Sequence, residues 1–103
     1  MLGVIVTFQY DEGSFDRARI EGVAEKAHPS FRDLPGLRLK AFTVDEENRR
    51  AVNVYLWEAD DAATSFFGDE LRERVTGLYG VAPRIDFVDV AALVDNAETP
   101  IAQ

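Results

Sequence analysis

The residues best suited to chemistry stand in one short stretch, Val52-Asn53-Val54-Tyr55-Leu56-Trp57. Aliphatic residues alternate here with an amide, a phenol and an indole, which is the period of a β-strand. Asn53, Tyr55 and Trp57 would therefore project from the same face of one strand. Each of these side chains can donate a hydrogen bond, so this face predicts a surface that meets a small ligand.

The single histidine, His28, is the other candidate for acid–base work. An imidazole titrates near pH 6.5 in water, so His28 could take a proton from a substrate if it faces the same pocket. It also stands beside Pro29 at the end of an expected helix, where it could simply cap the last carbonyl groups. The sequence leaves both interpretations open.

The other candidates also have structural interpretations. Trp57 and Tyr55 could simply fill the hydrophobic core. Asparagine is disfavoured inside strands, and Asn53 could face solvent at a sheet edge. Arg38 and Lys40 fall on one face of an earlier strand. We interpret them mainly as partly solvated charges that pair with acids, with steering of an anionic substrate as the alternative.

Composition narrows the class of protein. A chain of 103 residues is long enough for one domain, and a net charge of −8 disfavours binding to nucleic acid or to an anionic membrane. The absence of cysteine excludes disulfides and thiolate catalysis, and one histidine with no glycine-rich phosphate loop predicts neither a metal nor an organic cofactor. No signal peptide and no apolar run of about 20 residues is visible, so a cytoplasmic protein is expected.

Hydrophobic periodicity predicts a strand, a helix, two strands, a helix and a strand, an α+β order typical of a ferredoxin-like fold with a four-stranded antiparallel sheet. We expect both helices on one face of this sheet. Because aliphatic residues occupy both faces of most strands, a second copy of the chain is expected to cover the other face, giving a homodimer. The expected elements are strands at 2–9, 37–44, 51–57 and 84–93, and helices at 15–27, capped by Ser14, and at 61–77, interrupted at Gly68. The later part of the second helix is expected to carry an apolar stripe of Leu71, Val75 and Leu78. Residues 1–94 would form the single domain, and residues 95–103 a tail or exchanged arm.

Several segments carry a resemblance to a known family. They are Pro35-Gly36-Leu37-x-x-Lys40, the polar hairpin after it, Tyr55-Leu56-Trp57-Glu58 before an alanine-rich helix, and Gly80-Val81-x-Pro83-x-Ile85 before the last strand. In order and spacing, over about residues 2–93, these segments resemble the dimeric α+β barrel superfamily, and most of all its small mono-oxygenase family.

The resemblance implies a dimer that packs sheet to sheet, with a pocket in each subunit between the sheet and the helices. Related enzymes oxidise polycyclic phenols to quinones with molecular oxygen and no cofactor. In some of them an asparagine and a tryptophan four residues apart on one strand line the pocket, and Asn53 and Trp57 match that spacing. Closer relatives more often carry glycines where this chain has Val52-Asn53.

The sequence therefore leaves two main hypotheses for the function. The first is a cofactor-independent mono-oxygenase acting on an aromatic or polyketide-like phenol, with Asn53, Trp57 and His28 as catalytic residues and Tyr55 in substrate binding. The second is a non-catalytic protein that binds a small molecule or a partner on the same fold. Haem degradation, known in the superfamily, usually calls for a histidine on the second helix, and residues 61–77 contain none. An isomerase or cyclase also remains open.

Overall fold

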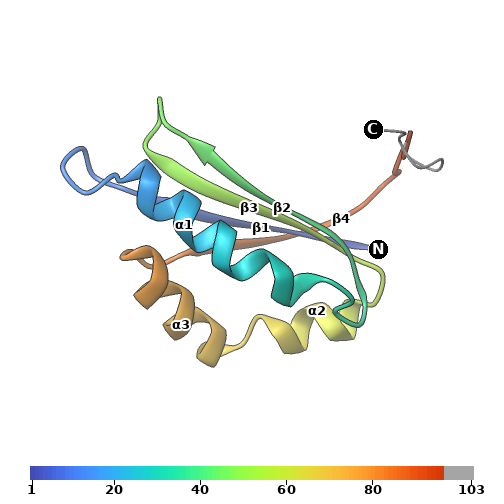
Figure 1. Cartoon of the computed structure of the whole chain (residues 1–103). Helices are drawn as coiled ribbons and strands as arrows, with labels where there is room; N and C mark the ends of the chain where they lie inside the picture. The colour runs from blue at the N-terminus through green and yellow to red at the C-terminus, as the bar shows by residue number, and fades with distance from the viewer. Residues whose placement is uncertain (97–103) are drawn as a thin grey trace.

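Four strands form one antiparallel sheet in the order β2-β3-β1-β4, and the helices connect them in the order predicted (Figure 1). The computed structural model describes residues 1–96. Its elements are β1 (Leu2–Gln9), α1 (Arg17–Ala27), the 3₁₀ turn η1 (His28–Phe31), β2 (Leu37–Asp45), β3 (Arg50–Trp57), α2 (Asp60–Phe66), α3 (Asp69–Tyr79) and β4 (Arg84–Asp89). The prediction of a ferredoxin-like α+β fold is confirmed.

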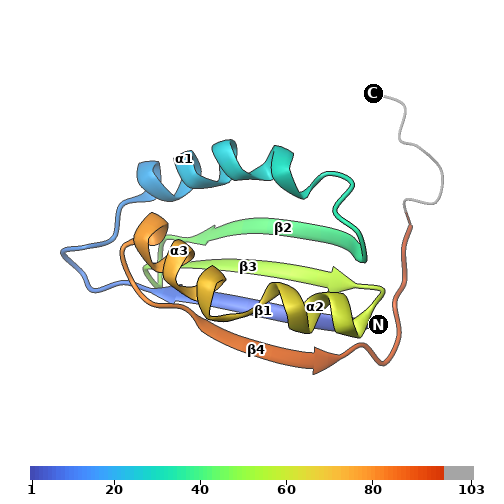
Figure 2. The ribbon, with the colours of Figure 1, turned by 90° about the horizontal axis from the view of Figure 1, so that it is seen from below.

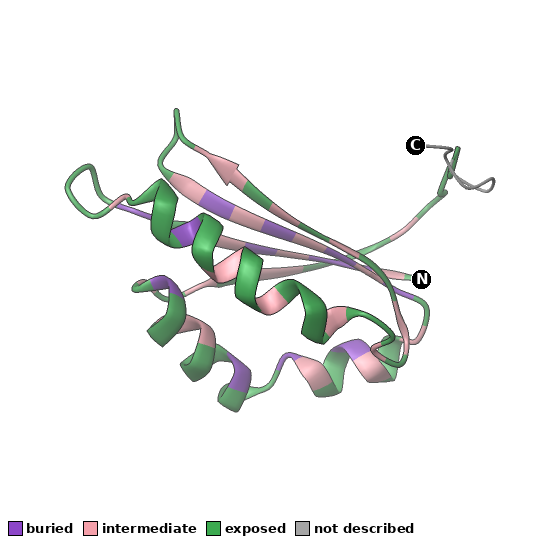
Figure 3. Ribbon diagram, in the orientation of Figure 1, coloured by how far each residue is buried: buried purple, intermediate pink, exposed green. Residues whose placement is uncertain are grey.

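All the helices lie on one face of the sheet, and in Figure 2 α2 and α3 pass in front of the strands. The strands turn alternate residues toward this helical layer. On β3 every second residue is buried, beginning with Ala51 and ending with Trp57 (Figure 3). On β1 the buried Val4, Val6 and Phe8 occupy the same face. The alternation predicted for the third strand is therefore confirmed, and its polar-aromatic residues face the helices.

The second strand departs from simple alternation. A β-bulge between Leu37 and Leu39 makes Arg38 an extra residue, because Leu37 pairs with Trp57 while Leu39 pairs with Leu56. The sequence interpretation put Leu37 and Leu39 on one face and Arg38 with Lys40 on the other, and this was wrong at the start of the strand. The bulge instead puts Leu37 on the helical side, where it packs against the core, whereas Leu39 is 41% exposed.

The start of the first helix and the end of the last strand differ from expectation. The first helix begins at Arg17, because the carboxylate of Asp16 accepts a 3.2 Å hydrogen bond from the backbone N–H of Arg19 and caps it. Ser14, the expected cap, instead bonds within the preceding turn. The second helical region is divided in two, as expected from Gly68, which caps α3. The last strand ends earlier than expected, at Asp89.

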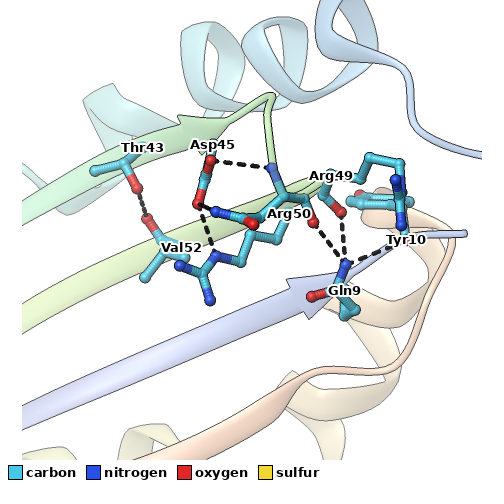
Figure 4. A network of polar contacts seen from close by, with 8 residues as sticks. Gln9, Tyr10, Thr43, Asp45, Arg49, Arg50 and Val52 are labelled. Carbon is cyan, nitrogen blue, oxygen red and sulfur yellow. Dashed lines mark hydrogen bonds and ion pairs between the residues drawn. The ribbon is translucent and has the colours of Figure 1, made fainter. Parts of the chain in front are cut away.

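The polar hairpin between β2 and β3 is held by local bonds (Figure 4). The Asp45 carboxylate pairs with Arg50 Nε at 2.9 Å and accepts a bond of the same length from the side-chain amide of Asn48. The amide nitrogen of Gln9 at the end of β1 donates to the carbonyl of Arg49 at 3.1 Å. These bonds hold the exposed hairpin together and join it to the end of β1.

The second face of the sheet carries aliphatic side chains that no described element covers. It includes Ile5, Val52, Val54 and Val88, and Val88 is 45% exposed. No helix within residues 1–96 has the length and apolar character needed to cross a membrane. Of the expected tail or exchanged arm at 95–103, only Asp95 and Asn96 lie within the described residues, and Asp95 pairs with Arg38 at 3.2 Å.

Candidate functional site

A cavity of about 410 Å³ lies between the sheet and the helical layer. Its walls are mainly apolar and aromatic. The lining residues come from β1, α1, η1, the following loop, β2, β3, α2, α3 and β4, and Phe67 between the last two helices, so nearly every element contributes. The few polar side chains among them are Ser30, Lys40, Asn53, Tyr55, Arg74 and Tyr79. A mostly apolar hollow with a few placed polar groups is the usual form of a small-molecule site.

Asn53 is the only buried polar residue of the described core and is 4% exposed. Its side-chain amide donates a 3.0 Å hydrogen bond to the hydroxyl of Tyr79 on α3. The position of Tyr79 is fixed in turn, because Phe8 stacks on its ring with the centroids 3.8 Å apart and the Tyr10 hydroxyl donates to its carbonyl at 2.7 Å. Asn53 is therefore oriented inside the cavity with a second amide hydrogen still available.

Sequence reasoning missed Tyr79. It assigned the apolar stripe of this helix to Leu71, Val75 and Leu78, but Leu78 is 46% exposed and Tyr79 is 3% exposed. Leu71, Val75 and Tyr79 follow one another at intervals of four positions, and this helical spacing would have found Tyr79. Burial raises the pKa of Tyr79 while the hydrogen bond from Asn53 acts in the opposite direction, so this phenol stays protonated at neutral pH.

Tyr55 lines the cavity beside Asn53, on the same face of β3. It is 3% exposed, and Phe67 contacts it edge to face with the centroids 4.9 Å apart. Burial raises the pKa of Tyr55, with a further contribution from Tyr79, so its hydroxyl is a proton donor and not a base.

Trp57 shares this face of β3 but does not line the cavity. It packs behind Tyr55, with its ring centroid 5.3 Å from that of Phe66 and 6.0 Å from that of Phe67. Its indole Nε1 is buried and has no hydrogen-bond partner among residues 1–96. An unpaired buried N–H costs about 1–3 kcal/mol, so this group is a defect of the core or a donor for a bound molecule.

The structure does not bring His28 to the cavity. The chain changes from α1 to the 3₁₀ turn at this residue, and Phe31, three residues later, turns inward instead. His28 is exposed and lines a more open outer hollow of about 440 Å³. Phe31, Lys40 and Phe42 line both hollows and therefore stand between them. Within residues 1–96, no three His, Asp or Glu side chains gather in a way that could hold a metal ion.

The sequence analysis gave Lys40 only a minor functional role, as a charge that could steer an anionic substrate. Its ammonium nitrogen lies 3.4 Å from the ring centroid of Phe31, 4.0 Å from that of Phe42 and 4.4 Å from that of Tyr55. Burial lowers the pKa of Lys40 to about 7. Arg38 behaves as expected and pairs with Glu58 at 3.2 Å as well as with Asp95, but no carboxylate within residues 1–96 pairs with Lys40. Lys40 is therefore not the solvated, acid-paired charge expected from the sequence.

Comparison with known proteins identifies the fold. No family model and no curated protein matches the chain. Among solved structures, it superposes on the monooxygenase from the gene ActVA-Orf6 of Streptomyces coelicolor, solved with nanaomycin D, with a TM-score of 0.68 and 22% identity over 93% of this chain and 92% of that one. It also superposes on SnoaB, a cofactor-independent oxygenase of Streptomyces nogalater, with a TM-score of 0.65 and 14% identity over 90% and 95% of the two chains.

A protein of unknown function from Nitrosomonas europaea is as similar in shape, with a TM-score of 0.69 and 13% identity over 93% of this chain and 94% of that one. The same architecture thus occurs in named oxygenases and in a protein without an assigned activity. The resemblance stated from the sequence is confirmed at the level of architecture: this chain has the ferredoxin-like α+β fold of these solved structures.

Proposed function

We propose that this protein is a cofactor-independent mono-oxygenase that oxidises a phenolic, polycyclic aromatic small molecule in the cavity between sheet and helices. The observation that carries the proposal is the oriented amide of Asn53 inside a mainly apolar and aromatic hollow of about 410 Å³. Pockets that bind small molecules usually enclose about 300–1,000 Å³. The architecture shared with two named oxygenases supports the same conclusion.

The proposed reaction converts a ring CH₂ of the substrate to a carbonyl with one O₂, and the second oxygen atom leaves as water. The electrons come from the substrate, so its phenol must first become an electron-rich phenolate. The free amide hydrogen of Asn53 is proposed to donate to this oxygen, and Tyr55 to line the substrate. Neutral donors fixed in advance stabilise such charge strongly because they need not reorganise.

Trp57 is proposed to support this wall from behind, through its contacts with Tyr55 and Phe66. Its indole N–H, which has no hydrogen-bond partner among residues 1–96, is a further donor near the site. His28 is not proposed as the base, because it is exposed and lines only the outer hollow.

We also propose that two copies associate through the open face of the sheet. Its aliphatic side chains on β1, β3 and β4 have no cover within residues 1–96, and a stable interface of the usual size, about 1,600 Å², would bury them. Sedimentation velocity should give about twice the 11.5 kDa chain mass. Val54→Lys, in the middle of this face, should give the monomer, and a monomeric parent protein would contradict this assembly.

Oxygen uptake with a panel of hydroxylated anthrones tests the function. We expect consumption of one O₂ for each quinone formed, and a rate lower by about 10-fold to 1,000-fold in Asn53→Ala, the range for loss of one stabilising donor. Asn48→Ala, in the hairpin at the sheet end, is the matched control and should keep the parent rate. Tight binding of these compounds without oxygen uptake would instead favour the non-catalytic binding protein.

A further inference from the structure

The side chain of Lys40 lies where the inner cavity and the outer hollow meet. Three aromatic rings from η1, β2 and β3 surround its nitrogen at 3.4–4.4 Å. The other ionisable side chains that line the two hollows are Arg74, Tyr55 and Tyr79 on the inner side and His28, Arg32, Asp33 and Arg38 on the outer side. Within the described part of the chain, no carboxylate lines the inner cavity.

These surroundings balance the two protonation states of Lys40. Burial removes water from the ammonium and lowers its pKa to about 7. The faces of the three rings act in the opposite direction, because their electron density attracts a cation. Both the amine and the ammonium are therefore accessible near neutral pH, as a group that accepts and returns protons requires.

The remaining groups of the inner cavity cannot accept a proton. Arg74 stays charged at any pH a protein survives. Tyr55 and Tyr79 are kept protonated by burial, which raises the pKa of each. An amide such as that of Asn53 does not act as a base near neutral pH. Among residues 1–96, Lys40 is thus the one side chain lining the inner cavity that can take up a proton.

We propose that Lys40 is the base of this cavity, whose neutral amine removes the proton of a bound phenol and whose ammonium then pairs with the phenolate. The phenolic O–H bond breaks, an N–H bond forms, and the electron pair stays on the substrate oxygen. The inference rests on the proposed function and deepens it, since it selects substrates with an acidic phenol or enol. No oxidant takes part in this step.

The first test concerns the protein without ligand. The chain has two lysines, Lys26 and Lys40, so an NMR spectrum of ¹³C-labelled lysine side chains contains two signals, which Lys26→Met assigns. We expect the Lys40 signal to titrate at least about two pH units below 10.4, the ordinary value for a lysine side chain. A Lys40 signal that titrates with that of Lys26 would overturn the proposal.

The second test uses 1,2-dihydroxyanthraquinone, a phenol already at the quinone level of oxidation, so it reports ionisation without turnover. Its phenolate absorbs at longer wavelength than its phenol. At a pH below its pKa in water, the parent protein and Lys26→Met should bind it as the phenolate, with a shift of its apparent pKa by at least about one unit, or tenfold in the ratio of phenolate to phenol. Lys40→Met and Lys40→Gln should bind it as the phenol.

The outcomes distinguish a failure of the proposed role of Lys40 from a failure of the proposed function. If the parent protein does not bind the dye, both the aromatic site and the role of Lys40 fall. If the dye binds but stays a phenol, or if the Lys40 variants ionise it as well as the parent does, the site stands and Lys40 is not its base. His28→Gln closes the remaining route, because loss of ionisation in that variant and not in Lys40→Met would move the role to the outer hollow.

Discussion

The stability of the folded protein should rise between pH 7 and pH 9.5 because of Lys40. Burial lowers the pKa of Lys40 from 10.5 to about 7 in the folded state. Between these two values the unfolded chain holds a proton that the folded chain has released. The free energy of unfolding increases with pH wherever the unfolded state binds more protons. The cost of burying the charge is therefore fully present below pH 7 and is relieved as the pH rises.

The size of the effect follows from the same two values. A shift of one pKa unit corresponds to about 1.4 kcal/mol, so the difference between 10.5 and about 7 sets an upper limit of about 5 kcal/mol. About 3 kcal/mol of this falls between pH 7 and pH 9.5 by the linkage relation, before the offset from the aromatic rings. For a domain of this size, one kcal/mol moves the melting temperature by about 4–8 °C. A rise of about 10–20 °C is therefore expected.

Urea unfolding at a series of pH values measures this directly, on the parent protein, Lys40→Met and Lys26→Met. Methionine fills the same space among the rings without the charge, so its curve should be nearly flat over this window, whereas the exposed Lys26 should leave the rise intact. The scan must stop below pH 10, because burial raises the pKa of the three tyrosines and their ionisation then destabilises the fold. Equal slopes for the parent and Lys40→Met would refute the argument and show a hydrated ammonium in the folded protein.

Three further perturbations test other parts of the description. Trp57→Phe should change the free energy of unfolding by no more than about 1 kcal/mol, because the lost ring volume is offset by removal of an unpaired buried N–H, whereas Trp57→Ala should cost about 3–5 kcal/mol in the same urea titration. Gly36→Ala should lower the melting temperature, since φ is +83° there and a Cβ would lie 2.8 Å from that of Ala62, whereas Gly22→Ala within α1 meets nothing within 4 Å and should stabilise by about 1 kcal/mol. Purified protein should be colourless and carry no stoichiometric metal, which absorbance and elemental analysis check; a haem or flavin spectrum would count against the proposed chemistry.

The sequence was informative where a periodic pattern alone determines the structure. Asn53, Tyr55 and Trp57 share a face because a strand has a period of two residues and β3 carries no bulge. The helix break followed equally from Gly68, since glycine is unfavourable inside helices. These features are local, so no knowledge of tertiary contacts was needed to predict them.

The sequence was less informative where the site depends on contacts between distant segments. Phe31 comes to lie over Lys40 only because the chain turns at η1, and nothing in the strand pattern around Lys40 reveals that contact. The separation of Trp57 from the cavity depends in the same way on Phe66 and Phe67. Tyr79 is a different case, because its helical spacing from Val75 was visible in the sequence. The sequence analysis chose Leu78 for the buried stripe because leucine is the more apolar residue, but Leu78 is exposed.

Lys40 also gives a reason for the order of binding and ionisation. The chain carries a net charge of −8, so a phenolate in solution is repelled on approach, whereas a neutral phenol is not. At a pH near or above 7 the amine is accessible, and the neutral phenol can enter without bringing a charge out of water. The ion pair then forms inside the aromatic cavity, where the low dielectric strengthens the attraction between ammonium and phenolate. An entering neutral phenol and a base of this kind are therefore better matched to this protein than capture of a substrate already ionised in solution.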